Sequence, residues 1–144
     1  MFLKSEEETK YLGKNISKEL LPNSIILLKG PIGSGKTSMV KGIAEGLFVN
    51  ENITSPTFAL SHHYDSGLIP IIHLDLYRIE DEISAKEIFW EEEEEAKENK
   101  AILIIEWPQL ILPVLNSYWL IEMEYAKNLG RECKVHKPLD FKKV

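Results

Sequence analysis

Ser24-Ile25-Ile26-Leu27-Leu28-Lys29 leads directly into Gly30-Pro31-Ile32-Gly33-Ser34-Gly35-Lys36-Thr37, and the architecture of the chain follows from this segment. Its first half is a short apolar run of β-forming residues, which is typical of a buried parallel strand. From Thr37 to Phe48, apolar residues recur at helical spacing. The sequence therefore predicts a strand, a glycine-rich loop and a helix in that order.

The loop matches G-x-x-x-x-G-K-[ST] at every fixed position. Between a strand and a helix, such a loop wraps a polyphosphate with its backbone N–H groups and the helix N-terminus. Lys36 is expected to reach the β- and γ-phosphates as a point charge, and the Thr37 hydroxyl to ligate Mg²⁺. The alternative is a glycine-rich turn with a solvated lysine, which the flanking strand and helix disfavour.

Two acids that end apolar strands are candidates for work beside the phosphates. Glu106 closes Ile102–Ile105 and is expected to be the second metal acid, although an acid there can also be simply the first exposed residue. Asp75 closes Ile71–Leu74 and would face the same crevice if its strand lies beside the loop strand. There it could orient water, but taken alone the sequence favours a cap or turn aspartate.

The remaining elements follow from capping, periodicity and turn residues. Ser5 and Glu8 have the spacing of a capping box at the start of a helix. Pro70 indicates that one strand of the hairpin is an exposed edge. The predicted elements are a helix over 5–20, a β-hairpin of 57–64 and 68–74 around Asp65-Ser66-Gly67, a helix over 83–99, a strand over 118–125, a last strand from Gly130 to Val135 and a frayed tail over 138–144.

Length and composition indicate one ordinary globular domain over residues 1–144, since the net charge is −6, with 44% hydrophobic and 28% charged residues. No apolar run approaches the roughly 20 residues of a membrane span. The N-terminus lacks a secretory pattern, so we expect a cytoplasmic protein. Residues 80–98 hold ten acids against two lysines, so the acidity is local. The basic stretch from Lys127 is expected to be solvated, with RNA or an acidic partner as the alternative.

Cysteine and histidine give no site. Cys133 is the only cysteine and is expected to be an inert, half-buried thiol. The four histidines have no metal-ligand spacing, and we expect them to be structural or exposed. They are His62, His63, His73 and His136.

Several stretches, in this order, resemble the small bacterial TsaE (YjeE) ATPases of the tRNA threonylcarbamoyladenosine pathway, over nearly the whole chain. They are Glu6-Glu7-x-Thr9, Gly30 to Thr37, Ser55-Pro56-Thr57-Phe58, His73-Leu74-Asp75-Leu76-Tyr77-Arg78, Ile105-Glu106-Trp107-Pro108 and Gly130-Arg131. Two departures stand out. Pro31 replaces an acid that is usual after the first loop glycine, and the stretch after Arg78 lacks an expected glycine-containing segment. These departures leave open a different partner contact for the helix over 83–99.

The resemblance implies a three-layer α/β fold of the P-loop NTPase kind, with a mostly parallel sheet and an antiparallel hairpin portion. It implies ATP and Mg²⁺ as cofactors, a switch-like segment Ser55–Phe58, and a TsaD–TsaB pair as partner, with tRNA reached only through that pair. Mg²⁺ would be held by Thr37 and Glu106, the catalytic residues would be Lys36, Asp75 and Glu106, and the nucleotide contacts would be Glu6, Gly33, Ser34, Gly35, Lys36, Thr37, Ser38, Asp75, Gln109 and Arg131.

Three function classes compete: an ATPase that serves a tRNA-modifying complex, a small-molecule kinase, and a nucleotide-dependent switch without useful catalysis. Arg78 and Arg131 are the only arginines, whereas a small kinase generally clamps its transferring phosphates with several. Asn99-Lys100-Ala101-Ile102 lacks the aspartate of the guanine-reading Asn-Lys-x-Asp pattern. Slow ATP hydrolysis that is stimulated by partners is therefore the expected activity.

Overall fold

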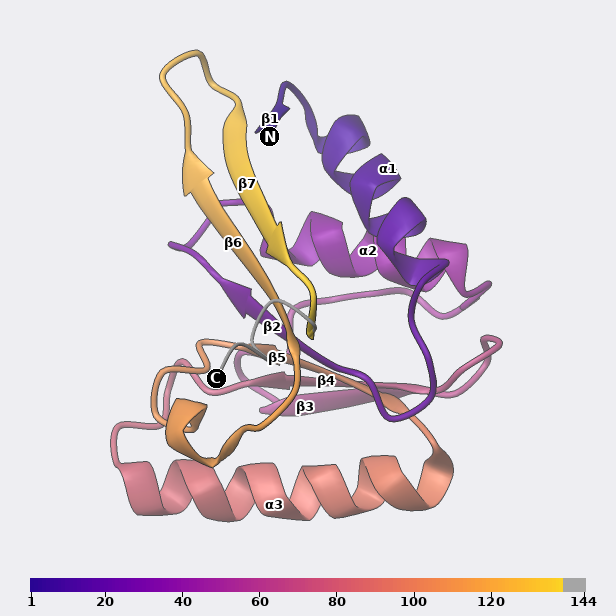
Figure 1. The fold of residues 1–144 in the computed structure, drawn as a ribbon, viewed down its shortest axis with the longest axis vertical. Helices are drawn as coiled ribbons and strands as arrows, with labels where there is room; N and C mark the ends of the chain where they lie inside the picture. The colour runs from indigo at the N-terminus through magenta and orange to yellow at the C-terminus, as the bar shows by residue number, and fades with distance from the viewer. Residues whose placement is uncertain (139–144) are drawn as a thin grey trace.

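The computed structural model describes residues 1–138, which form a seven-stranded mixed sheet between two helical layers (Figure 1). The sheet order is β1-β7-β6-β2-β5-β4-β3, and neighbours among β6, β2, β5 and β4 run parallel. The predicted frayed tail lies, from residue 139 on, outside the described residues. The elements are β1 (Phe2–Leu3), α1 (Glu6–Ser17), β2 (Ile25–Lys29), α2 (Lys36–Gly46), β3 (Ser61–Tyr64), β4 (Ile71–Asp75), α3 (Glu82–Asn99), β5 (Ile102–Glu106), the 3₁₀ turn η1 (Leu112–Val114), β6 (Trp119–Tyr125) and β7 (Arg131–His136).

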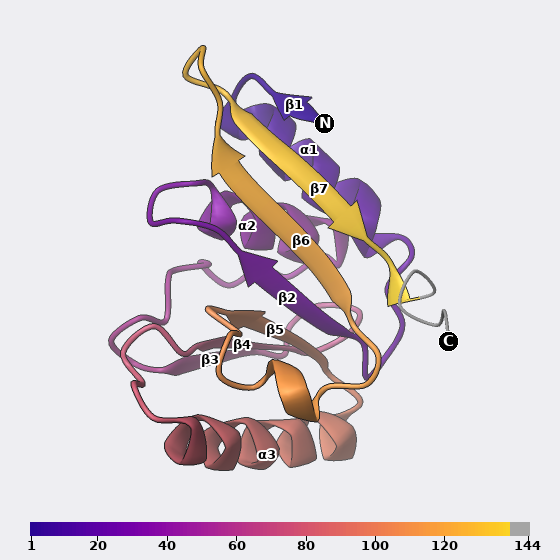
Figure 2. The same ribbon diagram turned by 60° about the vertical axis from the view of Figure 1, so that its left-hand side comes forward.

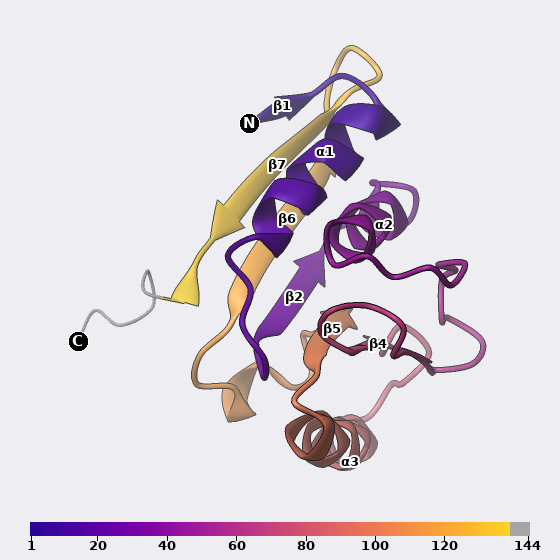
Figure 3. The same ribbon diagram turned by 90° about the vertical axis from the view of Figure 1, so that its right-hand side faces the viewer.

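Helices cover both faces of the sheet, α1 and α2 on one face and α3 on the other (Figure 3). Ile26 and Leu28 of β2 pack in the first layer and Leu27 in the second. A strand with both faces covered is apolar throughout, which explains the unbroken apolar run that precedes the β2–α2 loop. Gly42 lets α1 approach α2 closely, because a Cβ there would lie 2.2 Å from the carbonyl oxygen of Lys10.

The order of the predicted helices and strands is confirmed, with corrections at the sheet edges. β3 and β4 pair antiparallel and β3 is an edge strand, so one strand of the hairpin is an edge as predicted, although it is not the strand that Pro70 precedes. Pro70 precedes β4, and its carbonyl accepts a hydrogen bond from the Ile102 amide at 2.8 Å. β4 lies beside β5 and not beside the loop strand β2. β1, which pairs with β7, was not predicted.

Helix α3 forms despite its run of like charges. Lys86 with Glu82 and Lys97 with Glu93 make ion pairs one turn apart. Glu92 accepts from the Ser61 hydroxyl and contacts His63 Nε2 at 3.1 Å, which ties the helix to edge strand β3. Within residues 1–138, no helix has the length and apolar character of a membrane span.

Candidate functional site

The carboxyl ends of β2, β5 and β4 meet at one edge of the sheet, where a cavity of about 650 Å³ opens. Figure 2 shows the three strands side by side with the β2–α2 loop at their end. Register places Glu106 opposite both Leu28 and Asp75. Ligands of open α/β sheets bind at this edge, so the fold itself marks the cavity as the candidate site.

The N-terminus of α2 points into the cavity without a side-chain cap. Gly35 is its N-cap residue and adopts a left-handed conformation (φ 105°), which glycine reaches without strain. The amides of the first helical turn are left for a ligand, and the helix dipole gives them partial positive charge. Thr37, Ser38 and Lys41 of this helix line the cavity. Such an end suits an anion.

Lys36 is buried at the centre of the site, with only 6% of its surface exposed. Its Nζ donates to the carbonyl oxygens of Gly30 and Pro31, at 2.5 and 3.3 Å, and lies 4.1 Å from the centroid of the Trp107 ring. Burial lowers the pKa of the Lys36 ammonium, and the carboxylates of Glu106 and Asp75 oppose that shift. The ammonium is thus held beside two acids and a helix N-terminus.

Glu106 ends β5 and is buried, with 3% of its surface exposed. Its Oε2 lies 2.5 Å from Nε2 of His73, whose side chain is fully buried on β4. Within residues 1–138, Nδ1 of His73 has no hydrogen-bond partner. Sequence reasoning set His73 aside with the other histidines, because no local spacing relates it to an acid 33 residues later. Only the β4–β5 register reveals the pair.

Asp75 ends β4 beside Glu106 and is held by two neighbours. Its Oδ1 accepts from the Tyr77 amide and its Oδ2 from the Thr57 hydroxyl, both at 2.8 Å. Thr57 in turn contacts the Ser55 hydroxyl at 2.8 Å. The segment over 55–58, predicted to be switch-like, is therefore tied to a carboxylate at the cavity.

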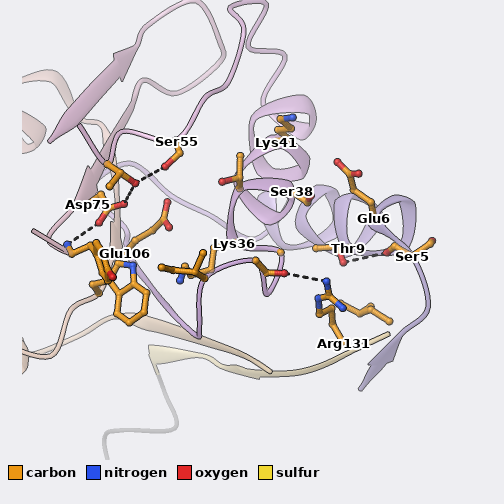
Figure 4. Close-up of a pocket in the computed structure, with 18 of the residues that line it drawn as sticks. Ser5, Glu6, Thr9, Lys36, Ser38, Lys41, Ser55, Asp75, Glu106 and Arg131 are labelled. Atoms are coloured by element: carbon orange, nitrogen blue, oxygen red, sulfur yellow. Dashed lines mark hydrogen bonds between the residues drawn. The ribbon is translucent and has the colours of Figure 1, made fainter. Parts of the chain in front are cut away.

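The far end of the cavity is built by α1 and the start of β7. Figure 4 shows Ser55, Asp75 and Glu106 on one side of Lys36, with Glu6 and Arg131 on the other. Arg131 donates to the Gly33 carbonyl at 3.0 Å and its guanidinium stacks on the Tyr125 ring. The cavity is thus elongated, with Lys36 between an acidic end and the α1 end.

The donor groups fit a nucleotide carrying Mg²⁺. Thr37, Asp75 and Glu106 present hydroxyl and carboxylate oxygens to one cavity, and oxygen is the ligand that Mg²⁺ prefers. No cluster of three or more His, Cys, Asp or Glu side chains suited to a metal is found among residues 1–138. A Mg²⁺ ion that arrives with phosphates needs only one or two protein ligands.

Most of the predicted site residues come together here. Gly33, Gly35, Lys36, Thr37, Ser38, Asp75, Glu106, Glu6 and Arg131 line the cavity. Ser34 is fully buried in the loop and its hydroxyl has no partner in the structure. Gln109 is exposed and does not line the cavity. Arg78 also lies outside the lining, with its guanidinium 5.3 Å from the ring of the exposed Phe58.

The cysteine and the histidines, which the sequence predicts to have no chemical role, do not line the cavity, and among them His73 contacts a residue that does. Cys133 is buried more deeply than expected, and burial raises the pKa of its thiol to about 11, which keeps it inert. His62 contacts Thr54 and Tyr64, whereas His136 pairs with Glu122 at 2.9 Å. These three residues pack or pair away from the cavity.

Comparison with known proteins identifies the family. The model for "Threonylcarbamoyl adenosine biosynthesis protein TsaE" matches residues 3–133. The chain belongs to the TsaE family. A tRNA threonylcarbamoyladenosine biosynthesis protein TsaE from Nostoc sp. is 37% identical over 94% of this chain and 83% of its own length. One from Treponema pallidum is 33% identical over 92% of this chain and 96% of its own length.

A solved structure agrees with the TsaE assignment. The crystal structure of Bacillus subtilis YdiB superposes with a TM-score of 0.78 and 26% identity, covering 96% of this chain and 84% of that one. The family resemblance inferred from the motifs is therefore confirmed, and the seven-stranded sheet with its parallel core is consistent with it.

Proposed function

We propose that this chain binds ATP with Mg²⁺ and hydrolyses it in support of threonylcarbamoyl modification of an adenosine beside the tRNA anticodon. One observation carries the proposal: a single elongated cavity joins an uncapped helix N-terminus, the buried Lys36 and two buried carboxylates. The positive groups suit phosphates and the carboxylates suit a metal ion and water. Membership of the TsaE family supplies the pathway.

The acidic end of the cavity suits the phosphate chain and its metal. The α2 amides and Lys36 would hold the β- and γ-phosphates, while Thr37 and Glu106 would hold Mg²⁺, which neutralises charge on the transferring phosphoryl group. Asp75 would orient the attacking water. Its two hydrogen bonds fix the carboxylate in place without help from a ligand.

The α1 end of the cavity suits the nucleoside. Glu6 and Arg131 line it, at a distance along the cavity from the acidic end (Figure 4). Both are proposed as nucleotide contacts, as are Gly33, Ser34, Gly35 and Ser38 of the loop and helix. Gln109, a contact implied by the resemblance, would need to move from its exposed position to take part.

The proposed partner is a TsaD–TsaB-like pair that carries out the threonylcarbamoyl transfer, while this chain turns over ATP. The kinase alternative is disfavoured because Arg131 is engaged at the α1 end and Arg78 lies outside the cavity lining. Neither arginine stands beside Asp75 and Glu106, where a transferring phosphoryl group would lie. A passive nucleotide switch remains the second candidate, and it differs by the absence of turnover.

Replacing Lys36 tests the nucleotide site. Lys36→Ala keeps the loop amides but removes the charge that meets the β/γ-phosphates, so it should weaken binding of a fluorescent ATP analogue at least tenfold and abolish ATP hydrolysis, since a charge-assisted hydrogen bond is worth about 1.5–3 kcal/mol. Lys18→Ala, at an exposed position beyond α1, is the matched control and should leave both unchanged.

Three outcomes separate the function classes. Binding and hydrolysis by Lys36→Ala at the parent's level would refute the phosphate site. A parent chain that binds ATP but never hydrolyses it, even with a TsaD–TsaB pair and tRNA present, would favour the passive switch. Transfer of the γ-phosphate to a metabolite, followed with labelled ATP, would favour the kinase.

A further inference from the structure

We propose that His73 is a positioning residue for the magnesium site, orienting the Glu106 carboxylate from beneath. The inference rests on the proposed role of Glu106 as a metal ligand. It adds a residue that does not line the cavity and therefore does not touch the ligand itself.

The sheet places His73 directly under the two acids. On β4, His73 and Asp75 are two residues apart and share a face of the strand, and Asp75 lies opposite Glu106 on β5. His73 itself lies opposite Ile104, two residues before Glu106 on β5. Its ring therefore reaches diagonally across the two strands, and Nε2 lies 2.5 Å from Oε2 of Glu106. The ring thus engages one oxygen of the carboxylate.

The second carboxylate oxygen of Glu106 stays available. Among residues 1–138 no further hydrogen bond of this carboxylate is found, and Glu106 lines the same cavity as Thr37. When the Glu106 carboxylate is ionised it only accepts hydrogen bonds, and Nε2 of His73 is then the donor. This donor fixes the rotamer of Glu106 and leaves its free oxygen for the cavity, as partners behind metal ligands do.

A purely structural role explains His73 poorly. Its side chain is fully buried, and the neighbouring residues on the same face, Ile71 and Ile104, are both completely enclosed apolar side chains. An apolar residue would fill this volume without burying an unpaired ring nitrogen, whereas histidine leaves Nδ1 buried and unpaired among the described residues. The single hydrogen bond that the ring gains is the one to Glu106, which points to orientation of that carboxylate.

The test compares variants that differ in the donor at Nε2. His73→Leu fills the volume without a donor, and His73→Gln keeps an amide donor at about the Nε2 position. Two quantities are measured: affinity for a fluorescent ADP analogue in EDTA, and Mn²⁺ affinity of the ADP-saturated protein by electron paramagnetic resonance. His73→Leu should weaken Mn²⁺ binding about tenfold, the lower end for groups behind metal ligands, and leave metal-free ADP binding unchanged.

Rescue separates positioning from packing. His73→Gln should restore Mn²⁺ affinity to within about threefold of the parent, a bound we set below the tenfold effect. If circular dichroism shows that His73→Leu does not fold, His73→Asn takes its place, because its shorter amide reaches only the Nδ1 position. Unchanged Mn²⁺ affinity in the donor-less variant, or equal losses of metal-free and metal-dependent binding, would overturn the inference.

Glu106→Gln separates this inference from the proposed function. If Glu106→Gln leaves Mn²⁺ affinity unchanged, the magnesium site itself is wrong. If it weakens Mn²⁺ binding while His73→Leu does not, only the positioning role fails. With both correct, His73→Leu should have no further effect on Mn²⁺ affinity in the Glu106→Gln background, since the oriented carboxylate is already gone.

Discussion

Asp75 and Glu106 differ in what their carboxylate oxygens do. Both oxygens of Asp75 accept hydrogen bonds, from Tyr77 and Thr57, whereas Glu106 uses one oxygen to contact His73. Both side chains are buried at the acidic end of the cavity. Glu106 therefore has coordination capacity left for a metal, and Asp75 is a fixed acceptor better suited to orient water.

At the residue scale, Asp75→Asn should separate binding from turnover. A carboxylate facing the γ-phosphate repels the bound substrate but positions water for attack. The amide can still accept from the Tyr77 amide and donate to the Thr57 hydroxyl, so the local structure should persist. We expect ATP affinity equal to or tighter than the parent's, with hydrolysis slowed about a hundredfold, as for loss of a positioned base.

Nucleotide titration and phosphate release measure the two quantities, with circular dichroism as the folding control. Equal losses of affinity and rate would identify Asp75 as a structural residue. The structure makes that outcome testable, because Thr57→Val removes the same hydrogen bond from the other side and should reproduce a structural effect.

Among the elements, the β6–β7 hairpin contacts the β2–α2 loop. The Tyr125 hydroxyl donates to the Ile32 carbonyl, and Arg131 donates to the carbonyl of Gly33. Arg131 and Tyr125 also stack, with 4.9 Å between guanidinium and ring centre. Two adjacent loop carbonyls are thus fixed, which leaves the loop amides oriented for a ligand.

Tyr125→Phe should loosen this hold without disturbing the stacking. One neutral hydrogen bond is worth about 0.5–1.5 kcal/mol, so nucleotide affinity should fall roughly two- to tenfold. Calorimetric titration with ADP measures the change. Tyr11→Phe, at an exposed position on α1, is the matched control and should bind like the parent. An unchanged affinity in Tyr125→Phe would show that the loop keeps its shape without the hairpin.

What the sequence could predict was local, and what it missed depended on pairing between strands. Glu106 was accessible because an acid closing an apolar strand is a pattern within one segment. His73 was not, because its partner is set by the β4–β5 register. β1 was not predicted because two residues carry no periodicity, and Pro70, which stands just before β4, did not show which strand of the hairpin is the edge.

The candidate site shows the same division between residues that one segment of sequence brings together and residues that only strand pairing brings together. The loop residues from Gly33 to Ser38 follow one another in sequence, and their arrangement around α2 needs no long-range information. Glu6 and Arg131 come from opposite ends of the chain and meet only because β7 pairs with β1, which precedes α1. Glu6, Arg131 and Gln109 were predicted from family resemblance alone, and of the three only Gln109 lies outside the cavity lining, at an exposed position.

At the scale of the whole molecule, positive charge is scarce where a transferring phosphoryl group would lie. Lys36 is the one buried lysine or arginine among the described residues, Arg131 is engaged at the α1 end, and Arg78 lies over Phe58 outside the cavity lining. An arginine supplied in cis or in trans accelerates phosphoryl transfer about 10³- to 10⁵-fold in phosphate-loop enzymes. In this structure neither arginine is therefore placed to make this contribution.

This scarcity predicts control by a partner. The chain alone should hydrolyse ATP slowly, and addition of a TsaD–TsaB pair should raise turnover at least about tenfold, a bound set below the full effect of an arginine. Phe58 lines the cavity, and the guanidinium of Arg78 lies against its exposed ring. Closure of the segment over 55–58 would therefore bring Arg78 toward the phosphates together with Phe58. The TsaD–TsaB pair should then stimulate Arg78→Ala less than it stimulates the parent chain. If it stimulates both chains equally, the positive charge beside the transferring phosphoryl group comes from the partner. Phosphate release with and without the pair measures both effects. A chain that turns over many ATP molecules per second alone, and ignores the pair, would contradict the charge argument at its root, because the cavity would then need no group beyond those it already holds.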